Sequence, residues 1–290
     1  MKAPHFLPYQ GSKRKVADQI IQHIPKSAQY NTLYEPFAGS AAFSLFALTT
    51  RPDSFNRIVL GESYTPLAEI WRMVIECPNS LVEQYEKLWC QQSDCKKENN
   101  DFYLKVREEF NVTLDPSSLL FLAARCVKNS IRFNSMGEFN QSADKRRKGV
   151  KPNTMAKNVF EVHELIKGRS EMLNADFMDI FNKATADDIV YCDPPWLGIT
   201  NTTNKRYYQQ LDLDRFVNGL ELLNSKSVDF LVSFDGMRGE KDYGGDLPSY
   251  LNLKKVYIDG GVSSQSVLNG MKERTLESLY ISESLCHKLN

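Results

Sequence analysis

The sequence predicts an α/β fold with a mostly parallel sheet, an antiparallel edge and an inserted block of helices. Strands and helices alternate from about residue 32 and again from about residue 154, which is typical of parallel βαβ units. Between these two parts, three helices follow one another. The last strands are joined by turns rich in glycine and serine. Such short turns indicate antiparallel strands, since parallel strands need long crossover connections.

The first part of the chain predicts two strand–helix units behind an amphipathic helix. Apolar residues at helical spacing, from Val16 to Ile24, predict that first helix. Ser40 is a suitable N-cap for the next helix, and Pro66 lies near the expected start of the one after it. The expected elements are a helix at 13–24, a strand at 32–34, a helix opening at 40–46, a strand at 57–60 and a helix at 66–75.

The alternation stops after residue 75, and we interpret 76–152 as a domain inserted between two parts of the main domain, 1–75 and 153–290. The block is expected to hold three helices and then a loop or hairpin over 133–151, because that stretch is polar and contains Gly137 and Gly149. The remaining expected elements are helices at 81–92, 100–111, 117–130, 154–167 and 212–224, and strands at 188–192, 228–234, 253–258 and 276–282.

Composition excludes several classes of protein. Lys plus Arg and Asp plus Glu are both 36, which excludes a globally basic coat for nucleic acid. The stretch from Arg125 to Lys151 nevertheless holds eight basic residues and two acids, a local charge of +6, which favours one anionic partner on one face. No apolar run approaches about 18 residues, so no membrane span is expected. The six cysteines lack zinc-ligand spacing, so we expect no metal site and a cytoplasmic protein.

The strongest chemical signal follows the strand at 188–192. That strand delivers Asp193, Pro194, Pro195 and Trp196 to its carboxyl end, where open α/β sheets bind ligands. The Asp193 carboxylate and the Pro194 carbonyl could accept both N–H groups of a planar amine. This would leave the nitrogen lone pair free for an electrophile. Trp196 offers a face on which an extruded base could stack.

Two further turns support a nucleoside site. Tyr34 to Ser40 forms a glycine-containing turn between strand and helix, where a nucleoside can approach the backbone closely. The turn lacks the GxGxxG pattern of a phosphate cradle, and Ala41 stands where that pattern would place a further glycine. About twenty residues later, Glu62 ends the next strand, in a position suited to ribose hydroxyl groups.

Together these residues resemble the N6-adenine-specific DNA methyltransferases of the Dam-like alpha group, the D12 class, in the family's order and over nearly the whole chain. Asp193-Pro194-Pro195-Trp196 matches the catalytic motif, with Trp in place of the commoner Tyr. Glu35-Pro36-Phe37-Ala38-Gly39-Ser40 resembles the first motif. Tyr9 and Lys13 stand where the amino-terminal segment of the family has an aromatic residue and a lysine.

The resemblance implies a Rossmann-like S-adenosylmethionine-dependent methyltransferase sheet with an inserted helical target-recognition domain. In the family, an acid and an aromatic residue recognise the adenine of the cofactor, and Asp176 and Phe177 stand at those positions. Glu62 replaces the usual Asp on the ribose. The implied catalytic residues are Asp193, Pro194, Pro195 and Trp196. The implied cofactor-binding residues are Tyr9, Lys13, Glu35, Phe37, Ala38, Gly39, Ser40, Glu62, Asp176, Phe177 and Asp193.

Candidate DNA contacts lie in the inserted block. The stretch Arg132 to Asn140 resembles the family's DNA-contacting hairpin. Arg132 and Asn134 are expected at base edges, because Arg pairs with guanine and Asn with adenine. The expected DNA-binding residues are Arg132, Asn134 and Asn140 of the hairpin, and Lys145, Arg146, Arg147 and Lys148, which would contact phosphates.

The predicted function is therefore transfer of a methyl group from S-adenosylmethionine to N6 of a flipped adenine in double-stranded DNA. The enzyme is expected to act as a monomer without a metal, in a bacterial cytosol or nucleoid or from a phage. Two alternatives stay open: a methyltransferase acting on another planar nitrogen, in RNA or a protein glutamine, and a catalytically silent DNA-binding homologue. The recognised site, and any restriction partner, are not predicted.

Overall fold

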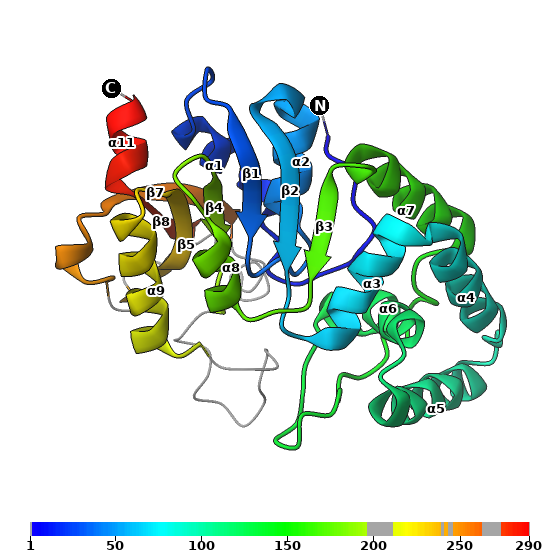
Figure 1. Ribbon diagram of the computed structural model, residues 1–290. Coiled ribbons are helices and arrows are strands. Elements are labelled where there is room, and N and C mark those ends of the chain that lie inside the picture. The colour runs from blue at the N-terminus through cyan, green and yellow to red at the C-terminus, as the bar shows by residue number, and fades with distance from the viewer. Residues whose placement is uncertain (1, 196–210, 239–240, 243–245, 263–273, 290) are drawn as a thin grey trace.

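The computed structural model describes residues 2–195, 211–238, 241–242, 246–262 and 274–289. Within this part of the chain, a single mixed sheet runs through the molecule in the order β3-β2-β1-β4-β5-β8-β7, with β6 paired to β5 (Figure 1). The strands are β1 (Tyr30–Glu35), β2 (Phe55–Gly61), β3 (Ser170–Leu173), β4 (Ile189–Cys192), β5 (Asp229–Arg238), β6 (Lys241–Asp242), β7 (Lys254–Val262) and β8 (Arg274–Ile281).

The strand directions confirm the predicted parallel sheet with an antiparallel edge. β1 pairs in parallel with both β2 and β4, and parallel pairing extends outward to β3 and β5. β8 pairs antiparallel with β5 and with β7. The carboxyl ends of the five parallel strands therefore meet at one edge of the sheet, where the binding residues were expected.

Helices cover both faces of the sheet. They are α1 (Ala17–Ile20), α2 (Ala42–Thr50), α3 (Thr65–Glu76), α4 (Pro78–Cys90), α5 (Lys96–Thr113), α6 (Pro116–Arg125), α7 (Pro152–Ile166), α8 (Phe177–Lys183), α9 (Leu213–Ser225) and α11 (Glu283–Leu289). Successive strand residues point to opposite faces. Leu33 accordingly belongs to a buried cluster with residues of α1, α2 and α3, whereas Tyr34 belongs to another with residues of α8 and α9.

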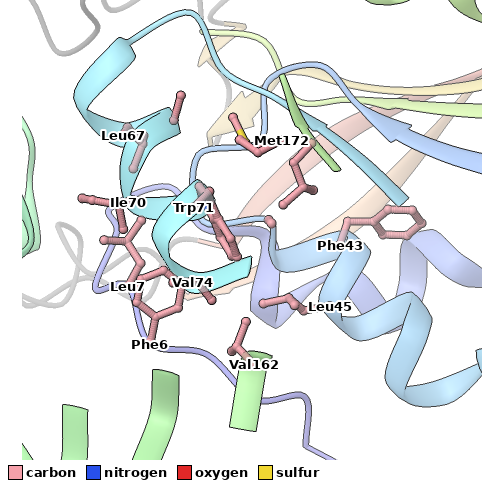
Figure 2. Close-up of a cluster of buried hydrophobic side chains, with 14 of the residues drawn as sticks. Phe6, Leu7, Phe43, Leu45, Leu67, Ile70, Trp71, Val74, Val162 and Met172 are labelled. Atoms are coloured by element: carbon pink, nitrogen blue, oxygen red, sulfur yellow. The ribbon is translucent and has the colours of Figure 1, made fainter. Parts of the chain in front are cut away.

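The amino-terminal segment packs against α3. Figure 2 shows Phe6 and Leu7 beside Trp71 and Val74, and the Phe6 and Trp71 rings meet edge to face with centroids 5.0 Å apart. The Trp71 indole N–H donates to the Gly39 carbonyl at 2.8 Å. A buried contact therefore ties α3 and the amino-terminal segment to the turn after β1.

The inserted helices α4, α5 and α6 gather beside α3 and α7, at the β3 end of the sheet (Figure 1). Their buried side chains, such as Tyr85, Tyr103 and Phe110, join the same buried cluster as the sheet residues. The block thus shares its core with the sheet. The domain boundaries at 76 and 152 fall beside the end of α3 and the start of α7, and the division into domains stays a prediction.

Several local predictions were wrong. The expected helix at 13–24 is broken into a 3-10 turn at Lys13–Lys15, the short α1 and a second 3-10 turn at Ile21–His23, with Val16 between the first two at φ −119° and ψ −3°. The expected helix at 117–130 ends at Arg125, because Cys126 is extended and Lys128 has a positive φ. β3, α8 and α11 were not expected, since each is short.

Candidate active site

A cavity of about 420 Å³ lies at the carboxyl ends of the parallel strands. Pockets of this size are typical for small cofactors. All eleven residues predicted to bind the cofactor line it: Tyr9, Lys13, Glu35, Phe37, Ala38, Gly39, Ser40, Glu62, Asp176, Phe177 and Asp193. The structure thus brings together residues from segments far apart in the sequence, and their individual roles stay predictions.

The turn between β1 and α2 forms one wall of the cavity. Gly39 has φ +47°, and a Cβ atom there would lie 3.2 Å from the Tyr9 ring. Close approach of the Tyr9 ring therefore requires glycine at this position. Ala41, the position where the sequence pattern would place a further glycine, also has a left-handed backbone with φ +47°. Its side chain makes that backbone conformation strained.

The predicted N-cap of α2 was wrong. Ser40 bonds to the hydroxyl of Ser12, and the cap position is Ala41, which has no side chain able to cap. The Glu35 carboxylate at the end of β1 replaces it, accepting bonds from the backbone N–H and the hydroxyl of Ser44 in the first turn of α2. Burial raises the pKa of Glu35 to about 8, although both Ser44 bonds oppose that rise.

Glu62, at the end of β2, holds the same turn from the other side. Its carboxylate accepts from the backbone N–H groups of Gly39 at 3.3 Å and Tyr64 at 3.0 Å. Burial raises its pKa, against the effect of these bonds. A carboxylate has about four acceptor positions, so Glu62 can still accept from hydroxyl groups of a ligand in the cavity.

Asp176 and Phe177 start α8 on the opposite wall. Asp176 caps the helix through the Met178 N–H, and its two oxygens also accept a bidentate pair of bonds from the Arg215 guanidinium at 2.7 and 2.9 Å. Arg215 lies 5.1 Å from the centroid of the Phe177 ring. A planar N–H donor over Phe177 and bonded to Asp176 resembles the arrangement expected for the adenine of the cofactor.

Asp193 stands directly after β4 and forms a buried ion cluster. Lys13 Nζ lies 3.2 Å from Asp193 Oδ1 and 3.0 Å from Glu277 Oε2 of β8. Burial raises the pKa of Asp193 to about 6, Lys13 opposes the rise and Glu277 adds to it. Burial disfavours the Lys13 ammonium, but the two carboxylates outweigh this effect and raise its pKa.

The two prolines after Asp193 differ in exposure. Pro194 is buried, and Pro195 lines the cavity. The predicted stacking residue, Trp196, lies outside the described residues. The structure therefore places the acid and the prolines of the motif beside the cavity, and the contribution of Trp196 stays a prediction.

The segment from Arg132 to Asn140 forms the expected hairpin. Phe133 pairs with Phe139, and the Asn140 N–H donates to the Arg132 carbonyl at 3.0 Å. Asn134 shapes the turn, because its side-chain oxygen accepts from the N–H groups of Met136 and Glu138 and its amide donates to the Glu138 carboxylate. Its side chain is thus engaged within the hairpin and would need to exchange these bonds to reach a base edge.

The base of the hairpin reaches the cavity. Ser130, Ile131 and Phe133 belong to the cavity lining, and the Phe133 ring meets Tyr64 edge to face at 5.0 Å. Arg132 is half-buried, and its Nε donates to the Ser130 hydroxyl. The element predicted to contact DNA therefore adjoins the element predicted to bind the cofactor.

The basic loop after the hairpin is partly neutralised. Asp144 accepts from Arg146 and Arg147, and Lys148 pairs with Asp94 at 2.5 Å. Lys145 and Arg146 are exposed, and the Arg146 side chain is 85% exposed. The positive charge that the loop offers to a partner is therefore smaller than its sequence indicates.

The sequence interpretation missed Glu277 and Arg215. Glu277 meets Lys13 across 264 sequence positions, and no local pattern could have signalled that contact. Arg215 lies one turn into a predicted helix, where an exposed arginine is ordinary. Among the described residues, no group of three potential ligands could hold a metal ion, and none of the described helices is long and apolar enough to cross a membrane.

Comparison with known proteins identifies the family. The family model for D12 class N6 adenine-specific DNA methyltransferases matches residues 9–256. A DNA adenine methylase of Serratia marcescens is 28% identical over 212 residues, covering 70% of each chain. The type II methyltransferase M.MjaIII of Methanocaldococcus jannaschii is 25% identical over 283 residues, covering 88% of this chain and 91% of that protein.

A DNA adenine methylase of Escherichia coli K12 is 28% identical over 228 residues, covering 74% of this chain and 76% of that protein. Among solved structures, an rRNA methyltransferase of Streptomyces viridochromogenes aligns over 94% of this chain and 85% of its own, at 12% identity and a TM-score of 0.40. That likeness is too remote to bear on function. The family match extends over most of the chain, and this protein therefore belongs to the D12 class of N6 adenine-specific DNA methyltransferases.

Proposed function

We propose that the cavity binds S-adenosylmethionine and that Asp193 orients the N6 amino group of an adenine rotated out of double-stranded DNA. The observation that carries this proposal is the shared cavity. Asp193 lines the same space as Gly39, Glu62, Asp176 and Phe177, so an acceptor for an amine lies beside residues suited to a nucleoside. S-adenosylmethionine supplies an electrophilic methyl group on a positively charged sulfur.

The cavity fits such a donor in charge and shape. Six carboxyl groups line it, against the two basic side chains of Lys13 and Arg215, an excess that favours a cationic ligand. Phe37 and Phe177 give it an aromatic wall, with ring centroids 5.4 Å apart. Glu62 has acceptor positions for ribose hydroxyls, and Asp176 would accept from the adenine amino group after exchanging bonds with Arg215.

The residues after β4 would activate the target amine by orienting it. The Asp193 carboxylate would accept one N–H and the Pro194 carbonyl the other, so that the nitrogen lone pair points at the methyl carbon. The nitrogen–carbon bond would form as the carbon–sulfur bond of the donor breaks, with the neutral thioether as leaving group, and Asp193 or water would accept the extra proton on nitrogen. Fixed acceptors in a partly buried site favour this transfer because they need little reorganisation. Trp196 would stack on the rotated base.

The hairpin and the loop after it would hold the DNA. Arg132, Asn134 and Asn140 would lie at the grooves, and Lys145, Arg146, Arg147 and Lys148 would meet phosphates. We also propose that the enzyme acts on DNA as a monomer. The relatives from Serratia and Escherichia are bacterial proteins, and we accordingly propose that the reaction occurs in the cytosol.

The proposal is tested by measuring donor binding and methyl transfer separately. The wild-type protein should bind S-adenosylmethionine in calorimetry and transfer a tritiated methyl group to unmethylated duplex DNA, with N6-methyladenine as the product. Asp193→Ala should lower the transfer rate by at least about 100-fold, the scale for loss of one transition-state contact, and leave the melting temperature within a few degrees. Asp179→Asn, an exposed acid of α8, is the matched control.

Three results would contradict the proposal. Methylation of RNA or of protein glutamine in preference to DNA would assign the site to another planar nitrogen. Donor binding without transfer to any of these substrates would indicate a silent DNA-binding homologue. Normal DNA methylation by Asp193→Ala would remove Asp193 from the mechanism.

A further inference from the structure

We propose that Glu277 is a positioning residue for methyl transfer, which shares the Lys13 ammonium with Asp193 and so keeps the Asp193 carboxylate available to the target amine. The inference rests on the proposed function of the cavity. It adds a residue of β8, in the antiparallel part of the sheet, to Lys13 of the amino-terminal segment and Asp193, which follows β4.

The geometry places Lys13 between two acids. Its Nζ lies 3.0 Å from Glu277 Oε2 and 3.2 Å from Asp193 Oδ1. The Lys13 side chain is 7% exposed, against 22% for Asp193 and 16% for Glu277. An ammonium has three N–H donors and no acceptor, so both carboxylates can bond to it at once. The more exposed acid, Asp193, keeps its remaining acceptor positions toward the cavity.

Removal of the Glu277 charge would change what Lys13 does to Asp193. Among the described residues, Asp193 would then be the remaining carboxylate in contact with the ammonium, so more of the attraction would fall on Asp193. Asp193 would accept more weakly from the target amine, because the ammonium competes for the same oxygens. With Glu277 present the cluster has a net charge of −1, and the ammonium is divided between two acceptors.

Other groups near Asp193 do not replace Glu277. Glu35, at the end of β1, is mostly neutral at pH 7, because burial, with a smaller contribution from the Asp193 charge, raises its pKa to about 8. Tyr191 of β4 is neutral, because burial raises its pKa well above the usual value, and its hydroxyl is 2.8 Å from that of Ser233. Cys192 is likewise neutral, since burial raises its pKa. Among these groups, only Glu277 contacts Lys13 within salt-bridge distance.

The pH dependence of the reaction tests this role. Asp193 must be ionised to accept from the amine, so kcat/KM of the wild type should fall as pH decreases through about 6, the pKa of Asp193. Glu277 raises that pKa. Glu277→Gln keeps the shape and one acceptor oxygen but removes the charge. The acidic limb should therefore move to lower pH by about one unit, and kcat on the plateau should fall about tenfold through the weakened acceptor.

Two further variants separate charge from structure. Glu277→Asp keeps the charge on a shorter side chain, so its acidic limb should stay near the wild-type pH even where its rate is reduced. Glu283→Gln, an exposed acid of α11 with a side chain 59% exposed, should match the wild type throughout. Affinity for S-adenosylmethionine and melting temperature, measured on each full-length variant, should change little.

The results of these measurements distinguish failure of the role of Glu277 from failure of the proposed methyl-transfer function. A wild-type enzyme with normal methylation and a Glu277→Gln profile that coincides with the wild-type profile would overturn the inference alone. An acidic limb that moves equally in Glu277→Asp and Glu277→Gln would assign Glu277 a purely structural role and overturn it too. A wild-type protein that binds the donor but methylates no substrate would overturn both proposals.

Discussion

Single residues at the β1–α2 turn set the shape of the cavity. The Tyr9 ring packs so close to Gly39 that a Cβ atom there would press against it. The Gly39 N–H donates to the Glu62 carboxylate, and the Gly39 carbonyl accepts from the Trp71 indole N–H. One glycine thus connects a wall of the cavity to the buried cluster behind it. The strain of Ala41 close by indicates that the turn is held in place by these surrounding contacts.

We predict that Gly39→Ala weakens binding of S-adenosylmethionine about tenfold, or about 1.4 kcal/mol, because the new methyl group displaces the Tyr9 ring. Calorimetry checks this. Gly168→Ala is the matched control, since Gly168 also has a positive φ but has no atom within 4 Å of a Cβ built there. Both variants should lose about 1–2 kcal/mol of folding stability through backbone strain. Equal donor affinity in the two variants would refute the role of Tyr9.

At the scale of elements, the Asn111 side chain bonds the hairpin to the helical block. Asn111 of α5 donates to the Phe139 carbonyl at 3.1 Å and accepts from the Phe139 N–H at 2.8 Å. This pair of bonds copies the pairing that a neighbouring strand would provide. Phe133, on the opposite strand of the hairpin, packs against Tyr64 of the cavity wall. The hairpin is therefore held from both sides.

Asn111→Ala should release one side of the hairpin. We expect affinity for duplex DNA to fall about fivefold to tenfold, because two partly buried hydrogen bonds, each contributing about 1 kcal/mol, are lost. Fluorescence anisotropy with labelled DNA measures this effect. Donor affinity should stay unchanged, and Asn100→Ala, near the other end of α5, should behave as wild type. Unaltered DNA binding by Asn111→Ala would show that the hairpin does not carry the interface.

Strands and helices, and their order, could be predicted from the sequence where the pattern of apolar residues determines them. Contacts between segments far apart in the sequence could not be predicted. The parallel strands could be located because β1, β2 and β4 are short apolar runs bounded by glycine or proline. β3 was missed because it has only four residues, Ser170 to Leu173, of which the first two are polar, so it forms no apolar run. Glu277 could not be connected to Lys13, since their contact depends on β8 lying beside β5.

The charge of the whole molecule is uneven, and part of its basic segment is engaged in contacts within the protein. The chain is formally neutral, and its basic segment encloses Arg125, which is only 2% exposed and bonds to the Asp144 carbonyl. Arg146 and Arg147 then neutralise the Asp144 carboxylate, which lowers its pKa. Part of the cluster therefore holds the loop together, and we propose that the exposed remainder contacts DNA phosphates.

We predict that Lys145→Ala reduces the slope of log affinity for duplex DNA against log salt concentration by about 0.9, the effect of one lost phosphate contact. Binding should weaken similarly on different sequences, because phosphates carry no sequence information. Lys26→Ala is the control, since Lys26 is exposed in the loop before β1, at the opposite edge of the sheet from the cavity. Identical slopes for Lys145→Ala and wild type would exclude Lys145 from the interface.

The ion cluster around Lys13 has a consequence for synthesis of the protein. Its two outer partners are supplied by β8 and by the chain just after β4, and the lysine by the amino-terminal segment. A ribosome must therefore finish β8 before the acceptor that we assign to the reaction is in its working electrostatic setting. A nascent chain would therefore lack full activity until β8 has been translated and has paired with β5.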